Sequence, residues 1–193
     1  MTNRSRSNNG RDHKREVATR LANAGRDPFA HHGYVNTPVY HASTLLYPST
    51  EDYLAHCGRY QYGRRGTPTS EALTTALADL EGPQCEAVVL LPSGLAAISA
   101  ALLSVVRAGD HILVTDSAYG PTRKFCDAIL PRYGVTTTYY DPTIGAGIAS
   151  LMRPNTVAIF VESPGSLSFE IQDVPGIAAA AHARKAVVLM DNT

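Results

Sequence analysis

The chain has 193 residues, 44% of them hydrophobic, which is enough for one sizeable core and short of a typical two-domain enzyme. Lysine plus arginine and aspartate plus glutamate number 17 each, and this balance argues against nucleic acid or an anionic membrane as the partner. The start lacks an apolar signal segment, and no run of about 18 apolar residues could span a bilayer. Three widely spaced cysteines, Cys57, Cys85 and Cys126, indicate reduced thiols, so we expect a cytoplasmic protein with a small-molecule site.

The N-terminal third shows little periodicity. The sequence is polar up to about Glu16 and is predicted to be disordered, and a short helical stretch is expected over residues 17–26. Residues 29–65 carry several tyrosines and histidines broken by prolines, which is typical of an irregular arm that lies on another surface. Leucines at helical spacing predict an amphipathic helix over residues 69–81, which a Gly-Pro pair ends.

After residue 86 apolar runs alternate with helical stretches, which is the pattern of βαβ units. The runs are apolar throughout rather than at every second residue, as in parallel strands with helices on both faces. We therefore expect an α/β fold with an open, mostly parallel sheet. The predicted strands are 87–91, 112–115, 135–140, 157–161 and 186–190, and the predicted helices are 96–106, 122–133, 148–152 and 174–184.

Ligands of such sheets bind beyond the carboxyl ends of the strands, so the residues after each strand are candidates for a site. Ser93-Gly94-Leu95 opens a helix after the first predicted strand, where free N–H groups suit a phosphate; an ordinary helix cap is the alternative. Tyr119 follows the second strand and could lie against a flat ligand, or simply cover the core. Asp191 ends the last strand, where a buried carboxylate needs hydrogen-bond donors or a cation such as a protonated pyridine nitrogen.

Tyr62 and Arg64 precede the regular part of the chain. Together they offer the forked donors of a guanidinium and a phenol to a phosphate; the alternative is that they are ordinary solvent-exposed side chains. The nucleotide-binding motifs G-x-x-x-x-G-K-[ST] and G-x-G-x-x-G are absent, as is the G-x-S-x-G elbow of hydrolases. The seven histidines show no metal-ligand spacing. These motifs therefore favour a phosphate-bearing small molecule and no metal.

Taken in chain order, five segments resemble motifs of the pyridoxal 5'-phosphate (PLP) enzymes of cysteine and methionine metabolism, the trans-sulfuration group of the aspartate aminotransferase fold. Their occurrence in the correct order is far more specific than any single one. The segments are Tyr62-Gly63-Arg64-Arg65-Gly66-Thr67-Pro68-Thr69, Ser93-Gly94-Leu95-Ala96-Ala97, Ala118-Tyr119-Gly120, Glu162-Ser163-Pro164 and Asp191-Asn192-Thr193.

The resemblance implies the three-layer αβα large domain of fold type I, with a mostly parallel sheet of strand order 3-2-4-5-6-7-1. This chain would supply strands 1 to 5 and therefore an incomplete sheet. Residues 1–60 are expected to be a disordered start and N-terminal arm, and residues 61–193 the first part of the PLP-binding domain.

The resemblance also implies roles for individual residues. Main-chain amides of Gly94 and Leu95 would hold the cofactor phosphate, and Asp191 would keep the pyridine nitrogen protonated. Tyr119 would stack on the ring and help to deprotonate the substrate amine. The arm residues would reach the phosphate of a neighbouring subunit in a homo-oligomer, a dimer or a tetramer. The implied cofactor-binding residues are Tyr62, Arg64, Gly94, Leu95, Tyr119 and Asp191, and the implied catalytic residues are Tyr119 and Tyr62.

Within the family, the run Glu162-Ser163-Pro164-Gly165-Ser166-Leu167 followed by Phe169-Glu170 is similar to bacterial cystathionine β-lyases. The implied reaction is cleavage of cystathionine, a sulfur amino acid, to homocysteine, pyruvate and ammonia in methionine biosynthesis. A γ-synthase or γ-lyase of the same family is the alternative, although these more often read E-S-P-T-N-P.

The Schiff-base lysine of the family lies beyond its D-N-T motif, and the arginine for the substrate carboxylate lies in a C-terminal domain. Lys14, Lys124 and Lys185 do not match that lysine. We therefore expect an N-terminal fragment without lyase activity of its own. Two other hypotheses stay open, namely a non-catalytic remnant that docks on full-length subunits and a phosphate-binding module unrelated to PLP.

Overall fold

A computed structural model of the chain describes residues 16–193, and these fall into two compact units that divide between Leu90 and Leu91. The disorder predicted before Glu16 concerns residues outside this range. In the described part of the chain, no helix is both long and apolar enough to cross a bilayer.

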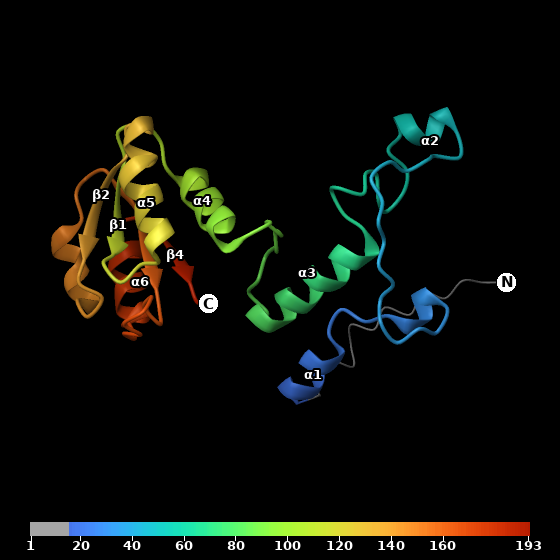
Figure 1. Ribbon diagram of the computed structural model, residues 1–193, viewed down its shortest axis with the longest axis horizontal. Helices are drawn as coiled ribbons and strands as arrows, with labels where there is room; N and C mark the ends of the chain where they lie inside the picture. The colour runs from blue at the N-terminus through green and yellow to red at the C-terminus, as the bar shows by residue number, and fades with distance from the viewer. Residues whose placement is uncertain (1–15) are drawn as a thin grey trace. The chain divides into compact units, whose positions relative to one another are not determined.

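The first unit is built from short helices joined by irregular chain, as predicted (Figure 1). Its longest helix, α3, is the amphipathic helix predicted from the leucine spacing. Thr67 caps α3 by accepting the N–H of Ser70, whose hydroxyl in turn accepts the N–H of Thr67. The helices of this unit are α1 (Val17–Asn23), η2 (Pro28–His31), α2 (Thr50–Leu54) and α3 (Pro68–Glu81).

The helix predicted over residues 17–26 ends early, at Asn23. Gly25 follows it with φ of 71°, and a Cβ there would lie 2.0 Å from the carbonyl oxygen of Ala72 in α3. Only glycine allows the chain to turn this close to α3. An ion pair between Arg20 and Asp79 also joins α1 to α3.

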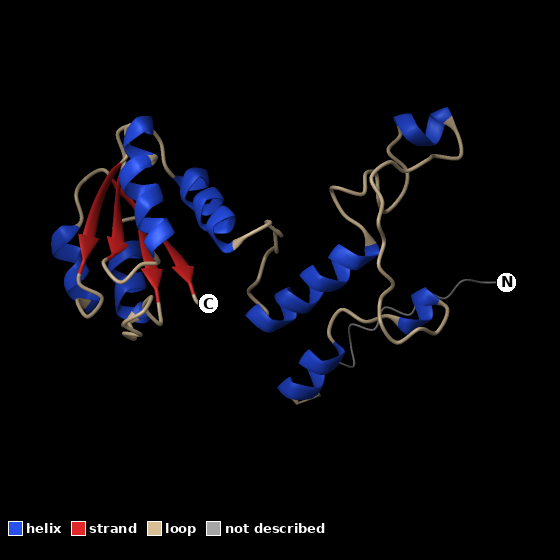
Figure 2. Cartoon of the chain, in the orientation of Figure 1, coloured by secondary structure: helices blue, strands red, loops and turns tan. Residues whose placement is uncertain are grey.

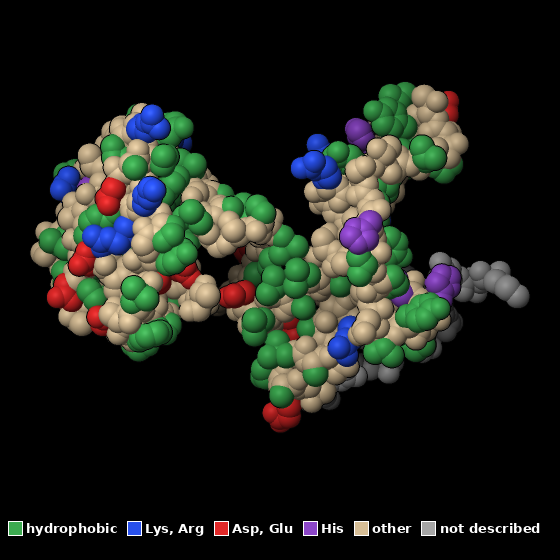
Figure 3. All heavy atoms as spheres, viewed as in Figure 1, with side chains coloured by type: hydrophobic (Ala, Val, Ile, Leu, Met, Phe, Trp, Pro, Cys, Tyr) green, Lys and Arg blue, Asp and Glu red, His purple; other side chains and the backbone are tan. Residues whose placement is uncertain are grey.

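One helix of the first unit differs from the sequence prediction, and one face of another is open to solvent. The short helix α2 was not predicted, although Ser49 caps it by accepting the N–H of Asp52 at 3.0 Å. Leu73 and Leu80 of the amphipathic helix α3 are exposed, and hydrophobic side chains gather over this helix in Figure 3.

The prediction of a strand over residues 87–91 is wrong. This segment pairs with no strand in the described residues, and Val89 is 77% exposed. Strand geometry persists only when a neighbouring strand satisfies its N–H and C=O groups, so an apolar run alone does not make a strand.

The second unit holds a sheet of four parallel strands in the order β2-β1-β3-β4. Counted from the predicted strand 87–91, this order reads 3-2-4-5, as the resemblance implied. The arrowheads of all four strands point the same way in Figure 2, so their carboxyl ends share one edge. The strands are β1 (His111–Thr115), β2 (Thr136–Tyr140), β3 (Thr156–Glu162) and β4 (Val187–Asp191).

Helices cover both faces of this sheet and confirm the three-layer α/β architecture. Ile112 and Val114 of β1 pack on one face with α4 and α5, whereas Leu113 packs on the other with α6 and η4. Alternate residues of a buried strand thus serve two cores, which explains the continuous apolar runs. The helices are α4 (Gly94–Val105), α5 (Gly120–Ala128), η3 (Leu130–Tyr133), η4 (Gly145–Leu151) and α6 (Val174–Ala183).

One predicted helix is two elements. Residues 122–133 were expected to form a single helix, but α5 ends at Ala128 and the 3-10 turn η3 follows it. Pro131 lies in the first turn of η3, and a proline has no N–H to continue the α-helical hydrogen bonds of α5.

Candidate functional site

A cavity of about 600 Å³ lies at the carboxyl edge of the sheet, within the second unit. Its lining comes from the N-terminus of α4 and from the segments that follow β1, β3 and β4. The lining residues are Ser93, Gly94, Leu95, Ile98, Tyr119, Pro121, Glu162, Pro164, Gly165, Ser166, Leu167, Phe169, Asp191 and Thr193.

The N-terminus of α4 brings hydrogen-bond donors to this cavity. Ser93 caps the helix, because its Oγ accepts the N–H of Ala96 at 3.1 Å and its carbonyl accepts that of Ala97 at 3.0 Å. Among the described residues, no acceptor is bonded to the N–H groups of Gly94 and Leu95. A Cβ added at Gly94 would meet nothing within 4 Å. Two unpaired donors at the positive end of a 12-residue helix suit an anionic group such as a phosphate.

Tyr119 lines the same cavity from the start of α5 and is 48% exposed. Its backbone N–H donates to Oε2 of Glu162 at 2.9 Å, and its carbonyl accepts the N–H of Arg123 at 3.1 Å. A partly exposed phenol fixed by its main chain offers an aromatic surface to a planar ligand.

Two carboxylates end neighbouring strands at the cavity. Glu162 of β3 and Asp191 of β4 are direct partners in the parallel ladder. Burial raises the pKa of Glu162 above its ordinary value; the N–H of Tyr119 acts against this rise and the charge of Asp191 adds to it. Asp191 accepts the N–H of Thr193 at 3.0 Å and its hydroxyl at 2.7 Å. Negative charge at this edge favours a ligand that carries a proton on a ring nitrogen.

The loop after β3 is held to the sheet by buried polar contacts. Gln172, which is 5% exposed, accepts the hydroxyl of Tyr140 at 3.0 Å and donates to the carbonyl of Glu162 at 2.8 Å. Its own N–H donates to Oγ of Ser163 at 3.0 Å. Near the loop's start, a Cβ at Gly165 would lie 2.8 Å from Cβ of Ser117. This loop therefore lies close against the segment that follows β1.

The structure brings four of the six predicted site residues together. Gly94, Leu95, Tyr119 and Asp191 all line the cavity. Glu162 was missed as a site residue, although it ends a buried strand as Asp191 does and the same reasoning applied to it.

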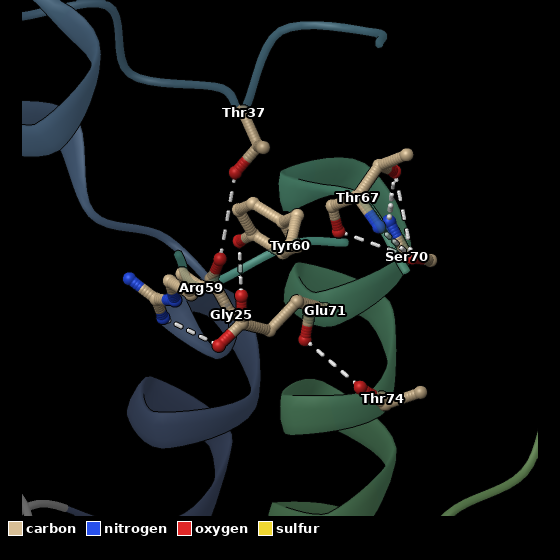
Figure 4. A network of polar contacts seen from close by, with 8 residues as sticks. All are labelled: Gly25, Thr37, Arg59, Tyr60, Thr67, Ser70, Glu71 and Thr74. Atoms are coloured by element: carbon tan, nitrogen blue, oxygen red, sulfur yellow. Dashed lines mark hydrogen bonds and ion pairs between the residues drawn. The ribbon is translucent and has the colours of Figure 1, made fainter. Parts of the chain in front are cut away.

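Tyr62 and Arg64 lie in the first unit. Tyr62 pairs with Thr44 in an isolated antiparallel bridge. Arg64 lines a separate hollow of about 560 Å³, where Arg59 forms an ion pair with Glu71 (Figure 4). The Tyr60 hydroxyl also donates to Glu71, and these two hydrogen bonds, with that of Tyr60 the stronger influence, lower the pKa of Glu71.

The chain matches a known family over most of its length. Residues 18–193 match the Cys/Met metabolism PLP-dependent enzyme family. The chain belongs to this family. The cavity fits the cofactor that the family name specifies, because unpaired N–H donors, an aromatic side chain and a carboxylate line one space.

Individual relatives carry related names. A Rhizobium johnstonii protein named "Putative cystathionine beta-lyase" is 52% identical over 92% of this chain and 44% of its own length. Cystathionine beta-lyase MetC of Escherichia coli is 41% identical over 93% of this chain and 47% of its own length. A solved structure of cystathionine gamma-lyase from Lactobacillus plantarum superposes with a TM-score of 0.81 at 32% identity, covering 93% of this chain and 45% of that one. The chain thus spans about half the length of the curated relatives it matches.

Proposed function

We propose that this chain belongs to a PLP-dependent carbon–sulfur lyase that converts cystathionine and water to homocysteine, pyruvate and ammonia, a step of methionine biosynthesis. The observation that carries the proposal is the cavity that the donors of α4, Tyr119 and Asp191 line together. The segment after β3, with Gly165 and Leu167, supports β-cleavage by its resemblance to bacterial β-lyases. A cytoplasmic location, inferred from the cysteine spacing, is part of this proposal.

Each lining residue has a distinct task in this proposal. The N–H groups of Gly94 and Leu95 bind the cofactor phosphate, and the ring of Tyr119 packs against the pyridine. Asp191 holds the proton on the pyridine nitrogen, and Tyr119 takes a proton from the substrate amine. When bound, PLP withdraws electrons from the α-carbon of the substrate.

We also propose that Tyr62 and Arg64 bind the cofactor phosphate of a neighbouring subunit in a homo-oligomer, and that the Tyr62 phenol lies near the reacting groups of that subunit's site. Gly63 lies between these two residues, and a Cβ there would lie 2.1 Å from the carbonyl oxygen of Ala42. This close packing holds the segment in one conformation and so supports a binding role. A γ-lyase or γ-synthase activity is the second candidate, and the superposition on a γ-lyase favours it.

Binding of pyridoxamine 5'-phosphate tests the site directly. This probe carries the ring and the phosphate but no aldehyde, so it cannot react with surface lysines. We expect calorimetry to show saturable binding to the chain, at least about tenfold tighter than that of pyridoxamine or of inorganic phosphate. Equal affinity for inorganic phosphate would contradict a pyridine site.

Substitutions at Gly94 show whether ligand binding depends on its N–H group or only on the presence of helix α4. Gly94→Pro removes one N–H at a helix position that accepts proline, and Ser93 already has the extended conformation that a following proline needs. Loss of one charge-assisted hydrogen bond should weaken binding of the probe about tenfold. The matched control is Gly94→Ala, which keeps the N–H and should bind as the unchanged chain does.

We further propose that these 193 residues alone do not cleave cystathionine. In the part of the chain that the structure describes, no lysine lines the cavity. An assay of pyruvate release from cystathionine with added PLP should show no more product than PLP alone. Turnover abolished by Asp191→Asn would refute this proposal.

A further inference from the structure

Glu162 is a buried acid at the cavity that the proposed chemistry does not use. It is 7% exposed, it lines the cavity, and its Oε2 accepts the N–H of Tyr119 at 2.9 Å. Burying a carboxylate is costly unless its hydrogen bonds compensate the loss of water. The hydrogen bond from the N–H of Tyr119 therefore helps to compensate the burial of the Glu162 carboxylate, and we ask what this bond does for Tyr119.

The contact to Glu162 is the hydrogen bond that joins Tyr119 to the sheet, because its other main-chain bond, from the N–H of Arg123 to its carbonyl at 3.1 Å, lies within the first turn of α5. The residues before Tyr119 are held by other hydrogen bonds. The N–H of Asp116 donates to the carbonyl of Tyr140 at 2.8 Å, and the N–H of Ser166 donates to the carbonyl of Ser117 at 2.8 Å. Within residues 16–193, the phenol of Tyr119 has no hydrogen-bond partner and its N–H has none besides Glu162. The position of the ring is thus set by its main chain.

Glu162 is itself fixed on two sides. The residue after it, Ser163, donates its N–H to the carbonyl of Asp191 at 3.2 Å, which extends the β3–β4 ladder past Glu162. On the other side Gln172 donates to the carbonyl of Glu162 at 2.8 Å. Because hydrogen bonds fix the backbone of Glu162, its side chain is a rigid acceptor for the neighbouring loop that carries Tyr119.

We propose that Glu162 is a positioning residue for Tyr119: its carboxylate grips the backbone N–H at the start of α5 and so fixes the aromatic ring at the cavity. The task of the ring in binding the pyridine rests on the function proposed above. The hydrogen bond and its effect on the loop do not depend on that function.

The first test needs no ligand. Amide hydrogen exchange of Tyr119, measured by NMR on the labelled chain, should be at least about tenfold faster in Glu162→Ala. Glu162→Gln retains an acceptor oxygen and should restore most of the protection. Exchange that is equally slow in Glu162→Ala would overturn the proposal.

A titration decides the question even if Glu162→Ala does not fold. The Tyr119 amide proton shift should titrate in the unchanged chain and become flat in Glu162→Gln. Asp191, the facing carboxylate on β4, is present in both chains and so serves as the internal control. A titration that is the same in both chains, or absent from both, would overturn the proposal.

The second test uses pyridoxamine 5'-phosphate. We expect Glu162→Ala to weaken its binding about tenfold, and Glu162→Gln to change it less than about threefold. In a Tyr119→Ala background, Glu162→Ala should cause no further loss, because the ring that it positions is gone. An equal loss in both backgrounds would overturn the positioning role. No binding by the unchanged chain would refute the proposed function, and amide exchange would still decide the role of Glu162.

Discussion

Replacement of Gln172 by alanine should destabilise the second unit strongly. Its side chain makes two buried hydrogen bonds, with the Tyr140 hydroxyl at 3.0 Å and the Glu162 carbonyl at 2.8 Å. Each bond contributes about 1 kcal/mol, and leaving a buried carbonyl without its donor costs about 1–2 kcal/mol more. The single proton of the Tyr140 hydroxyl has a second acceptor, the Phe160 carbonyl at 3.1 Å, so this hydroxyl stays hydrogen-bonded without Gln172 and adds little to the loss. We therefore expect Gln172→Ala to lower the free energy of unfolding by about 3 kcal/mol.

Urea unfolding followed by circular dichroism measures this loss. With a urea dependence of about 1–3 kcal/mol per molar, the midpoint should fall by roughly 1 M or more. The control is Tyr140→Phe, which removes only the hydroxyl and should cost about 1 kcal/mol. The double variant should cost less than the sum of the two, because both remove the same bond. A loss below about 0.5 kcal/mol for Gln172→Ala, or strict additivity, would refute the reasoning.

Two further effects can be measured in the same way. Burial, and then the charge of Arg153, lower the pKa of His111, so the unfolded chain binds the proton first. The contribution of His111 to the free energy of unfolding should be level above about pH 6.5 and fall as the pH drops below it, by at most about 1.4 kcal/mol per pH unit; an undiminished slope in His111→Asn would contradict this. Gly165→Ala should cost about 1–3 kcal/mol, because its Cβ would lie 2.8 Å from Cβ of Ser117. The matched Gly120→Ala, with nothing within 4 Å, should stay within about 0.5 kcal/mol, and equal losses would argue against the clash.

The sequence predicted the sheet of the second unit well because its strands are buried on both faces. All four strands there were predicted within two residues, as were the helices α4 and α6. The strand 87–91 failed because apolar content does not provide a pairing partner. The break after Ala128 was missed because the apolar spacing continues across Pro131.

At the site, too, local sequence patterns predicted the individual residues but not the contacts between distant segments. The rule that ligands bind at strand ends identified Tyr119 and Asp191, and the helix start identified Gly94. It did not identify Glu162 as a partner of Tyr119, because that contact joins residues 43 positions apart. Local patterns show which residues reach an edge, whereas the hydrogen bonds between them depend on how the loops cross it.

A continuous path of hydrogen bonds joins the sheet core to the cavity. It runs from the Tyr140 hydroxyl through the Gln172 amide to the carbonyl of Glu162, whose side chain then holds Tyr119. The first link joins two side chains, the second joins the Gln172 side chain to the backbone of Glu162, and the third joins the Glu162 side chain to the backbone of Tyr119. Substitutions at Gln172 and at Glu162 therefore break different links and should differ in effect. Gln172→Ala should lower stability and loosen Tyr119, whereas Glu162→Gln should leave both nearly unchanged because the path stays intact. The stability of the core and the position of the ring are thus linked through one main-chain carbonyl.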